Sequence, residues 1–163
     1  MDTLALKKLK EHFGDSIVST DDFRGDLSIT IKRDKINPIC KFLRDTQGLE
    51  YTMLMDICGV DYLGRKTPRF EVVYHLYSPT TKHRLRLKAQ VPEQDPTIDT
   101  VTDLWKAAGW FEREVYDMFG IKINGHPHLR RILLHDEFQG HPLRKDYPVD
   151  KRQPLSKPAS LVE

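Results

Sequence analysis

Residues 112–148 read EREVYDMFGIKINGHPHLRRILLHDEFQGHPLRKDYP, and this stretch decides how the chain is organised. It contains two Gly-His-Pro corners, at 125–127 and 140–142. Glycine permits a positive φ and proline fixes φ, so both corners predict defined turns. A pair of cations follows each corner, and the apolar run 132–134 between them is too short to bury itself. The stretch therefore predicts an arm that another surface must cover.

The same stretch also carries a resemblance to a known family. The segments EREVYDMFGI (112–121), GHPHLRRILL (125–134) and GHPLRKDYP (140–148) resemble, in order and spacing, the signature of the 30 kDa-type subunit, or C subunit, of proton-pumping NADH:quinone oxidoreductase, respiratory complex I. The resemblance implies a hydrophilic component of the peripheral arm, without catalytic residues of its own, that packs on the subunit lining the quinone site. It also implies that FMN and the iron–sulfur clusters, which carry electrons from NADH to quinone, belong to other subunits.

Length, composition and net charge restrict the classes of protein to which the chain can belong. A chain of 163 residues with 39% apolar content predicts one domain with a genuine core. Its longest apolar runs fall far short of the roughly 20 residues that cross a bilayer. The net charge of +2 is too small to indicate nucleic-acid binding.

The N-terminus, MDTLALKKLKEHFG, is interrupted by lysines and does not read as a secretory signal. Together with the resemblance, this predicts a peripheral location at the cytoplasmic face of the bacterial inner membrane. For an organellar source, the corresponding place is the matrix side of the mitochondrial membrane.

Hydrophobic periodicity predicts alternating helices and short strands. In chain order we expect a helix at 3–13, strands at 17–20 and 27–31, a helix with Asn37 as N-cap and Pro38 at its first position, strands at 51–58, 69–77 and 83–91, and two short helices within 98–119 that break near Gly109. This order predicts an α+β two-layer sandwich, with helices on one face of a mainly antiparallel sheet. Strand order does not follow from the pattern.

A change in composition marks a boundary after Gly120, which ends the last expected helix. Prolines and histidines concentrate beyond it. We therefore predict an α+β domain at 1–121 and an extended partner-binding arm at 122–163, whose last residues from 151 are expected to lack order when alone.

We expect the arm and the helix at its root to bind the partner subunits. Apolar anchors and arginines that fork onto carboxylates or carbonyls are the reason for this expectation. Arg113 and Asp117, one helical turn apart, are expected to pair. The predicted interface residues are Glu112, Arg113, Glu114, Asp117, His126, Arg130, Arg131, Ile132, Leu133, Phe138, His141, Arg144, Lys145, Asp146 and Tyr147.

A metal site in the arm is the main alternative, and it would make the chain a small stand-alone metal-dependent enzyme. Its candidate ligands are His126, His128, His135 and His141, with Asp136 and Glu137. Their spacing matches no HExxH or Cys/His framework, so we favour histidines that form hydrogen bonds at turns.

Two further readings are weaker. Glu112 and Glu114 could be an acid/base pair, but two residues apart on a helix they point in different directions. The arm's cations lack the context of a recognised DNA or RNA motif.

The chain shows no sequence motif for a cofactor. It has no GxGxxG, P-loop or CxxC pattern, so we expect no flavin, nucleotide or cluster in it. Its two cysteines, Cys40 and Cys58, are too few for a zinc or iron–sulfur site on their own. His75 and His83 fall on expected strands and are interpreted as surface or hydrogen-bonded residues.

Overall fold

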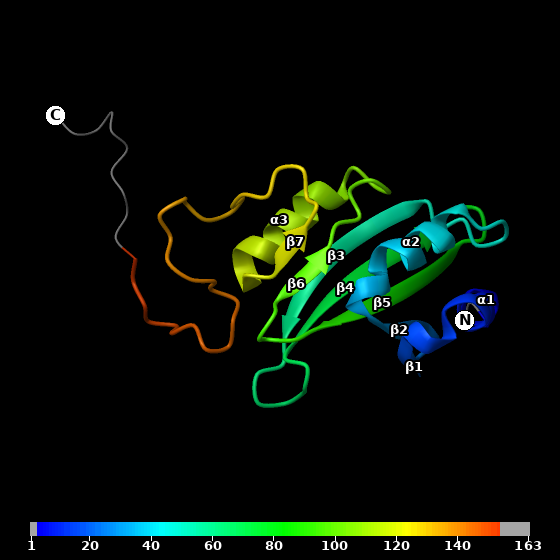
Figure 1. Ribbon diagram of the computed structural model, residues 1–163, viewed down its shortest axis with the longest axis horizontal. Helices are drawn as coiled ribbons and strands as arrows, with labels where there is room; N and C mark the ends of the chain where they lie inside the picture. The colour runs from blue at the N-terminus through cyan, green and yellow to red at the C-terminus, as the bar shows by residue number, and fades with distance from the viewer. Residues whose placement is uncertain (1–2, 154–163) are drawn as a thin grey trace.

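A five-stranded mixed sheet forms the centre of the molecule (Figure 1). The structure is a computed structural model and describes residues 3–153. The strands are β1 (Ile17–Phe23), β2 (Asp26–Lys32), β3 (Met53–Asp61), β4 (Phe70–Ser78) and β5 (His83–Val91). They lie in the order β1-β2-β5-β4-β3, with β2 and β5 parallel and the other neighbours antiparallel. The prediction of a mainly antiparallel α+β sheet is therefore confirmed.

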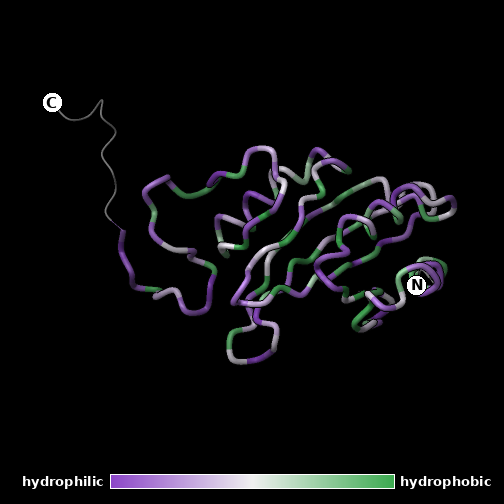
Figure 2. Tube along the Cα trace, in the orientation of Figure 1, coloured by the Kyte–Doolittle hydropathy of each residue, from purple (hydrophilic) through white to green (hydrophobic). Residues whose placement is uncertain are grey.

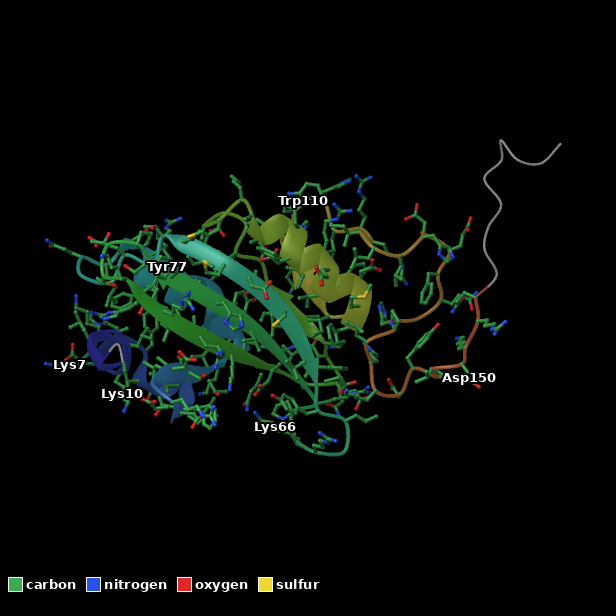
Figure 3. All side chains as sticks on the ribbon, turned by 180° about the vertical axis from the view of Figure 1, so that it is seen from behind. Lys7, Lys10, Lys66, Tyr77, Trp110 and Asp150 are labelled. Carbon is green, nitrogen blue, oxygen red and sulfur yellow. The ribbon has the colours of Figure 1, made fainter. Side chains whose placement is uncertain are left out.

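Three α-helices accompany the sheet within the described residues. They are α1 (Thr3–Phe13), α2 (Ile36–Asp45) and α3 (Ala108–Phe119). Figure 1 shows α1 and α2 on one face of the sheet, and α3 beside the edge strand β3. Figure 3 shows the molecule from behind, with β3, β4 and β5 lying in front of α2. Because α3 packs along β3, it hinders the pairing of that edge strand with other chains.

The core lies between the sheet and the helices. Strand β5 shows the expected alternation, since Leu85, Leu87, Ala89 and Val91 are buried while the residues between them reach solvent. Figure 2 shows apolar residues along the central strands, interspersed with polar ones. Each fully buried leucine or valine of this kind contributes roughly 1.5–3 kcal/mol of transfer free energy.

The prediction that Asn37 caps the second helix is wrong. α2 begins at Ile36, directly after a 3-10 turn at Arg33–Lys35. The Asn37 side chain instead donates to Thr100 O and to Asp103 Oδ1, both at 2.9 Å. Asn37 therefore ties α2 to a distant segment, and this tertiary contact takes the place of a local cap.

The prediction of two helices within 98–119 is wrong in its first half. This region begins with the short strand β6 (Thr97–Asp99) and continues through turns to the single helix α3. The error has a physical cause, because the buried side chains Ile98, Val101, Trp105 and Ala108 follow a helical spacing. Contacts with other elements fix this segment as turns, including a hydrogen bond of 3.0 Å from Trp105 Nε1 to Thr52 O.

The chain remains part of the domain slightly beyond residue 121. A short strand, β7 (Lys122–Asn124), pairs in parallel with β6, and Ile123 is buried. From Gly125 the arm runs across the surface, loops outward and returns near the end of the sheet (Figure 1). From residue 154 onward, the segment expected to lack order when alone lies outside the described residues. No helix within 3–153 is long and apolar enough to cross a membrane.

Candidate partner-binding arm

A buried carboxylate on α3, that of Asp117, holds the first half of the arm. Its Oδ2 accepts three consecutive backbone N–H groups, from Ile132 at 3.0 Å, Leu133 at 2.9 Å and Leu134 at 3.0 Å. Its Oδ1 accepts from Arg131 Nη1 at 2.7 Å. Burial raises the pKa of Asp117, but these donors outweigh burial, so the pKa lies below the ordinary value. The arm thus supplies the donors that keep this buried carboxylate ionised.

Two arginines secure the same region through backbone carbonyls. Arg113 Nε donates to Arg130 O at 3.0 Å, and Arg113 Nη2 donates to Arg131 O at 2.7 Å. Arg131 Nη2 in turn donates to Phe138 O at 2.9 Å and to Gly140 O at 3.2 Å. The planar guanidinium groups therefore join successive turns of the arm to each other and to α3.

The expected pairing of Arg113 with Asp117 is wrong. Asp117 pairs with Arg131, and Arg113 points to the arm's carbonyl groups. An exposed i, i+4 pair is worth only a few tenths of a kcal/mol, whereas a fully buried carboxylate must find several donors. The arm provides them, so the tertiary arrangement prevails.

A charged cluster at the end of the sheet holds the second half of the arm. The Arg69 side chain is 5% exposed, and its Nε and Nη2 donate to the two carboxylate oxygens of Asp61 at 2.9 and 2.7 Å. Its guanidinium also donates to Glu93 at 2.6 Å and to Asp146 at 2.8 and 3.1 Å. Lys145 N donates to Asp61 Oδ2 at 2.8 Å. We call Arg69, Asp61, Glu93 and Asp146 the Arg69 cluster.

The Arg69 cluster stabilises the ionised form of its buried acid. Burial alone would raise the pKa of Asp61, but Arg69 and the N–H groups of Lys145 and Leu63 lower it to about 2. The carboxylates around Arg69 raise the pKa of the guanidinium above its ordinary value. Because Asp146 belongs to the arm, attachment of the arm completes this set of charges.

Glycines allow the arm to return so closely. Gly120 ends α3 with φ +70°, and a Cβ there would lie 2.6 Å from the His141 ring. Gly140, in the second Gly-His-Pro corner, has φ +101°, and a Cβ there would lie 2.9 Å from the Tyr147 ring. The Phe138 ring stacks on Tyr147 with centroids 5.9 Å apart. Larger residues at the two glycines would push the arm away.

The predicted interface residues fall into four groups. Six use their side chains to attach the arm to the domain, namely Arg113, Asp117, Arg131, His141, Arg144 and Asp146. Four others are exposed to solvent, namely Glu114, Arg130, Leu133 and Lys145. Ile132, Phe138 and Tyr147 are half-buried in the arm, while Glu112 and His126 make their contacts within the domain. Many of these residues therefore bind their own chain.

The outer side of the arm keeps large apolar groups in solvent. Leu133 is 63% exposed, and Leu143 is also exposed. Trp110, at the start of α3, is 64% exposed and projects outward (Figure 3), with the Arg113 guanidinium 5.3 Å from its ring. Aromatic residues and arginine are enriched at protein interfaces, which makes these side chains candidates for contact with a partner. We call Leu133, Leu143 and Trp110 the apolar ridge.

Glu112 faces the interior and acts as a structural acceptor. It is 1% exposed, and it accepts from Val101 N at 2.7 Å and from Thr100 Oγ1 at 2.6 Å. His126 Nε2 lies 3.9 Å from Glu112 Oε2. Burial raises the pKa of Glu112 to about 7, although both hydrogen bonds oppose the shift. Glu114 is exposed on another side of α3, so the two glutamates do not form an acid/base pair.

The raised pKa of Glu112 predicts a pH-dependent stability. The folded chain binds a proton near pH 7, whereas a carboxyl with the ordinary pKa of 4.5 does so only in more acidic solution. Folding therefore becomes more favourable as pH falls from about 7 to about 4.5, by roughly 3 kcal/mol from this group. Glu112→Gln is expected to remove this gain. Urea unfolding at both pH values measures it, with Glu114→Gln as control. An unchanged pH dependence in Glu112→Gln would refute the assignment.

The arm's histidines are engaged in local structure. His126 Nε2 donates to Gly109 O at 3.1 Å, while its Nδ1 accepts from His128 N at 3.0 Å. His141 Nδ1 donates to Asp117 O at 2.9 Å. Within residues 3–153, the arm's histidines and acids do not bring three ligand atoms together. This geometry gives no support to a metal-dependent enzyme built from the arm.

Sequence reasoning missed Arg69, Asp61, Glu93 and Trp110. Arg69 directly precedes the apolar strand FEVVYHLY, and Asp61 ends the neighbouring strand. Charges that flank buried strands need partners, and this is a usable signal. It cannot identify the partner, because Asp146 lies 77 residues further along the chain.

Comparisons with known proteins agree with this architecture. A family model described as "Respiratory-chain NADH dehydrogenase, 30 Kd subunit" matches residues 29–153. The NADH-quinone oxidoreductase C subunit of Geobacter sulfurreducens is 53% identical over 145 residues, covering 89% of this chain and 88% of the relative. The corresponding protein of Roseiflexus castenholzii, which bears the same name, is 48% identical over 144 residues, covering 88% and 82%.

Two solved structures superpose on the chain. The trypsin-resistant fragment (1–134) of Nqo5 gives a TM-score of 0.63 at 36% identity, covering 77% of this chain and 99% of the fragment. A chain of the membrane-bound sulfane sulfur reductase, an archaeal respiratory membrane complex, gives a TM-score of 0.74 at 23% identity, covering 88% and 84%. The second likeness shows the fold alone. Family model, relatives and fold agree with the resemblance of residues 112–148, and the chain belongs to the family of the 30 kDa subunit of respiratory-chain NADH dehydrogenase, the C subunit of NADH:quinone oxidoreductase.

Proposed function

We propose that this chain is a non-catalytic structural subunit of the peripheral arm of NADH:quinone oxidoreductase, and that it docks through the apolar ridge on the subunit lining the quinone site. The observation that carries the proposal is the fixed arm. Asp117 and the Arg69 cluster hold its inner side, while Leu133 and Leu143 on its outer side stay in solvent. An arm fixed before binding loses less conformational entropy when a partner covers it.

The charge around the apolar ridge suggests the chemistry of the partner surface. Arg130 and Lys145 are exposed on the same arm, and so are Asp136 and Glu137, so the ridge fits an apolar groove whose rim carries charges of both signs. Rim charges of this kind mainly set association rate and orientation, while the two leucines and Trp110, once a partner covers them, supply affinity.

In this proposal the redox chemistry belongs to the partners. FMN and iron–sulfur clusters in other subunits pass electrons from NADH to quinone, coupled to proton translocation. This chain contributes position, because a rigid arm limits the movement of the quinone-site subunit on which it lies. The names of the relatives support a place in the complex. From that place we propose a location at the cytoplasmic face of the inner membrane, or at the matrix side in an organelle.

Affinity purification from gently solubilised membranes tests the proposal. Flavin- and cluster-bearing chains with NADH oxidation activity should co-purify. Recovery of the chain alone would contradict assembly into the complex.

Leu133→Asp tests the docking surface. Because Leu133 is 63% exposed, the variant should fold as stably as the parent. Assembly should fall about tenfold or more, because a desolvated charge replaces an apolar anchor. Phe23→Asp is a matched control, since Phe23 is 64% exposed and lies on β1, away from the arm. Equal losses in both variants, or a lower unfolding midpoint for Leu133→Asp alone, would contradict the assignment.

A further inference from the structure

The face of the sheet that points away from α2 brings unlike side chains into one row. Asp56 on β3 lies directly opposite His75 on β4, and His75 lies directly opposite Arg86 on β5. Cys58 follows Asp56 by two residues on the same strand, so its side chain points to the same face. Figure 3 looks onto this face. The strand ladder therefore gathers a carboxylate, a thiol and an imidazole.

These three groups could coordinate one ion. One ligand atom from each of Asp56, Cys58 and His75 lies within 4.8 Å of the other two. None of the three side chains has a hydrogen-bond partner among the described residues, in contrast to His126 and His141 of the arm. Asp56 and His75 also line a cavity of about 380 Å³, through which an ion can reach them. The ligand atoms are thus close together, uncommitted and accessible.

We propose that Asp56, Cys58 and His75 form a binding site for a divalent transition-metal ion of the zinc class. Imidazole nitrogen, thiolate sulfur and carboxylate oxygen are the ligands that Zn²⁺ takes in proteins. A tetrahedral ion places ligand atoms roughly 3.3–3.6 Å apart, and side-chain rotation on the fixed strands can close the present spacing. Three protein ligands leave a fourth position for water or for a group from a partner.

The charges fit such an ion. On binding, the Cys58 thiol releases its proton to solvent, and the thiolate with the Asp56 carboxylate balances the two positive charges. Glu114 on α3 adds negative potential at Cys58, while Arg86 opposes it. The Arg86 guanidinium is turned toward β2, where Nη1 donates to Ser28 Oγ at 3.1 Å. This site differs from the metal site considered from the sequence, which used the histidines and acids of the arm. Here Cys58 and Asp56 come from β3 and His75 comes from β4.

Metal titration of the purified full chain tests the proposal. The stripped chain is titrated with Zn²⁺ by calorimetry, and with Co²⁺ as a spectroscopic probe of thiolate ligation. We expect one equivalent to bind, and the Co²⁺ form to show a sulfur-to-cobalt charge-transfer band. Cys58→Ser and His75→Gln should each weaken binding about tenfold or more, and Cys58→Ser should abolish the band. Arg86→Gln should tighten binding several-fold, since it removes a like charge.

Matched controls make the result decisive. His128→Gln removes an exposed histidine of the arm and should leave binding unchanged. Unfolding midpoints of all variants show whether a loss reflects misfolding, and the Co²⁺ spectrum of the unaltered chain does not depend on any variant. Absence of saturable binding, or affinity equal to that of the parent in Cys58→Ser and His75→Gln, would overturn the proposal. Loss of binding in His128→Gln would also overturn it, because the site would then lie in the arm.

Discussion

Asp117→Ala is expected to release the arm and to lower the free energy of unfolding by about 3–5 kcal/mol. The substitution deprives three consecutive backbone N–H groups of their acceptor and leaves Arg131 without its carboxylate. If the arm stayed in place, these N–H groups would be partly buried and unpaired. Detachment lets water satisfy them, so we expect the arm to open locally before the domain unfolds.

Limited trypsin digestion measures this opening directly. The arm carries Arg130, Arg131, Arg144 and Lys145 as cleavage sites. Their cleavage should accelerate about tenfold or more in Asp117→Ala, because the open form becomes more populated. Asp117→Asn retains an oxygen acceptor but loses the ion pair, and it should fall between the parent and Asp117→Ala. Glu114→Gln, exposed on the same helix, should digest at the parent rate. Parental digestion of Asp117→Ala would show that the carboxylate does not hold the arm.

Arg69→Met is expected to destabilise the chain by about 3–5 kcal/mol at neutral pH. Methionine fills much of the volume but leaves Asp61, whose side chain is fully buried, without its cation. The arm loses the contact with Asp146 at the same time. Arg65→Met, exposed in the loop before Arg69, is the matched control and should change stability little.

The pH dependence of Arg69→Met separates charge from packing. In the parent, the depressed pKa of Asp61 stabilises the fold above the ordinary carboxyl value, and this stabilisation disappears as pH falls through about 2. Without Arg69, burial dominates and the Asp61 pKa rises. Asp61 then takes up a proton in mildly acidic solution, so the deficit should shrink as pH is lowered. Urea unfolding of the parent and of Arg69→Met at neutral and mildly acidic pH measures this deficit in the free energy of unfolding. A deficit independent of pH would indicate lost packing alone.

Local patterns predicted the parts of the fold that depend on local physics. The helix at 3–13 and the strand at 83–91 appear with the predicted bounds, because each buries one regularly spaced face. The prediction of a helix within 98–107 was wrong, because the buried residues of this segment have a helical spacing without forming a helix. Hydrogen bonds to Glu112 and Thr52 hold the segment in turns. Periodicity reports which residues are buried, and it does not report which element buries them.

The site was predictable as a region but not as a set of contacts. Residues 112–148 did form a defined arm rooted in a helix, and its Gly-His-Pro corners have positive φ at both glycines. The partners of its charges came from elsewhere, as Asp117 pairs with Arg131 and Asp146 with Arg69. A sequence shows that a charge must be satisfied, but only the packed chain decides by which residue.

The parallel pairing of β2 with β5 constrains the order in which the sheet can form during synthesis. A nascent chain emerges with β1 and β2 first, and these can form a hairpin at once. The edge of β2 that faces away from β1 stays unpaired until β5 is made, and β5 follows α2, β3 and β4 in the chain. During translation, the edge of β2 is thus open to incorrect neighbours until residue 91 has left the ribosome. The sheet therefore cannot close around β2 before the first 91 residues are available, although β1 and β2 are adjacent in the chain.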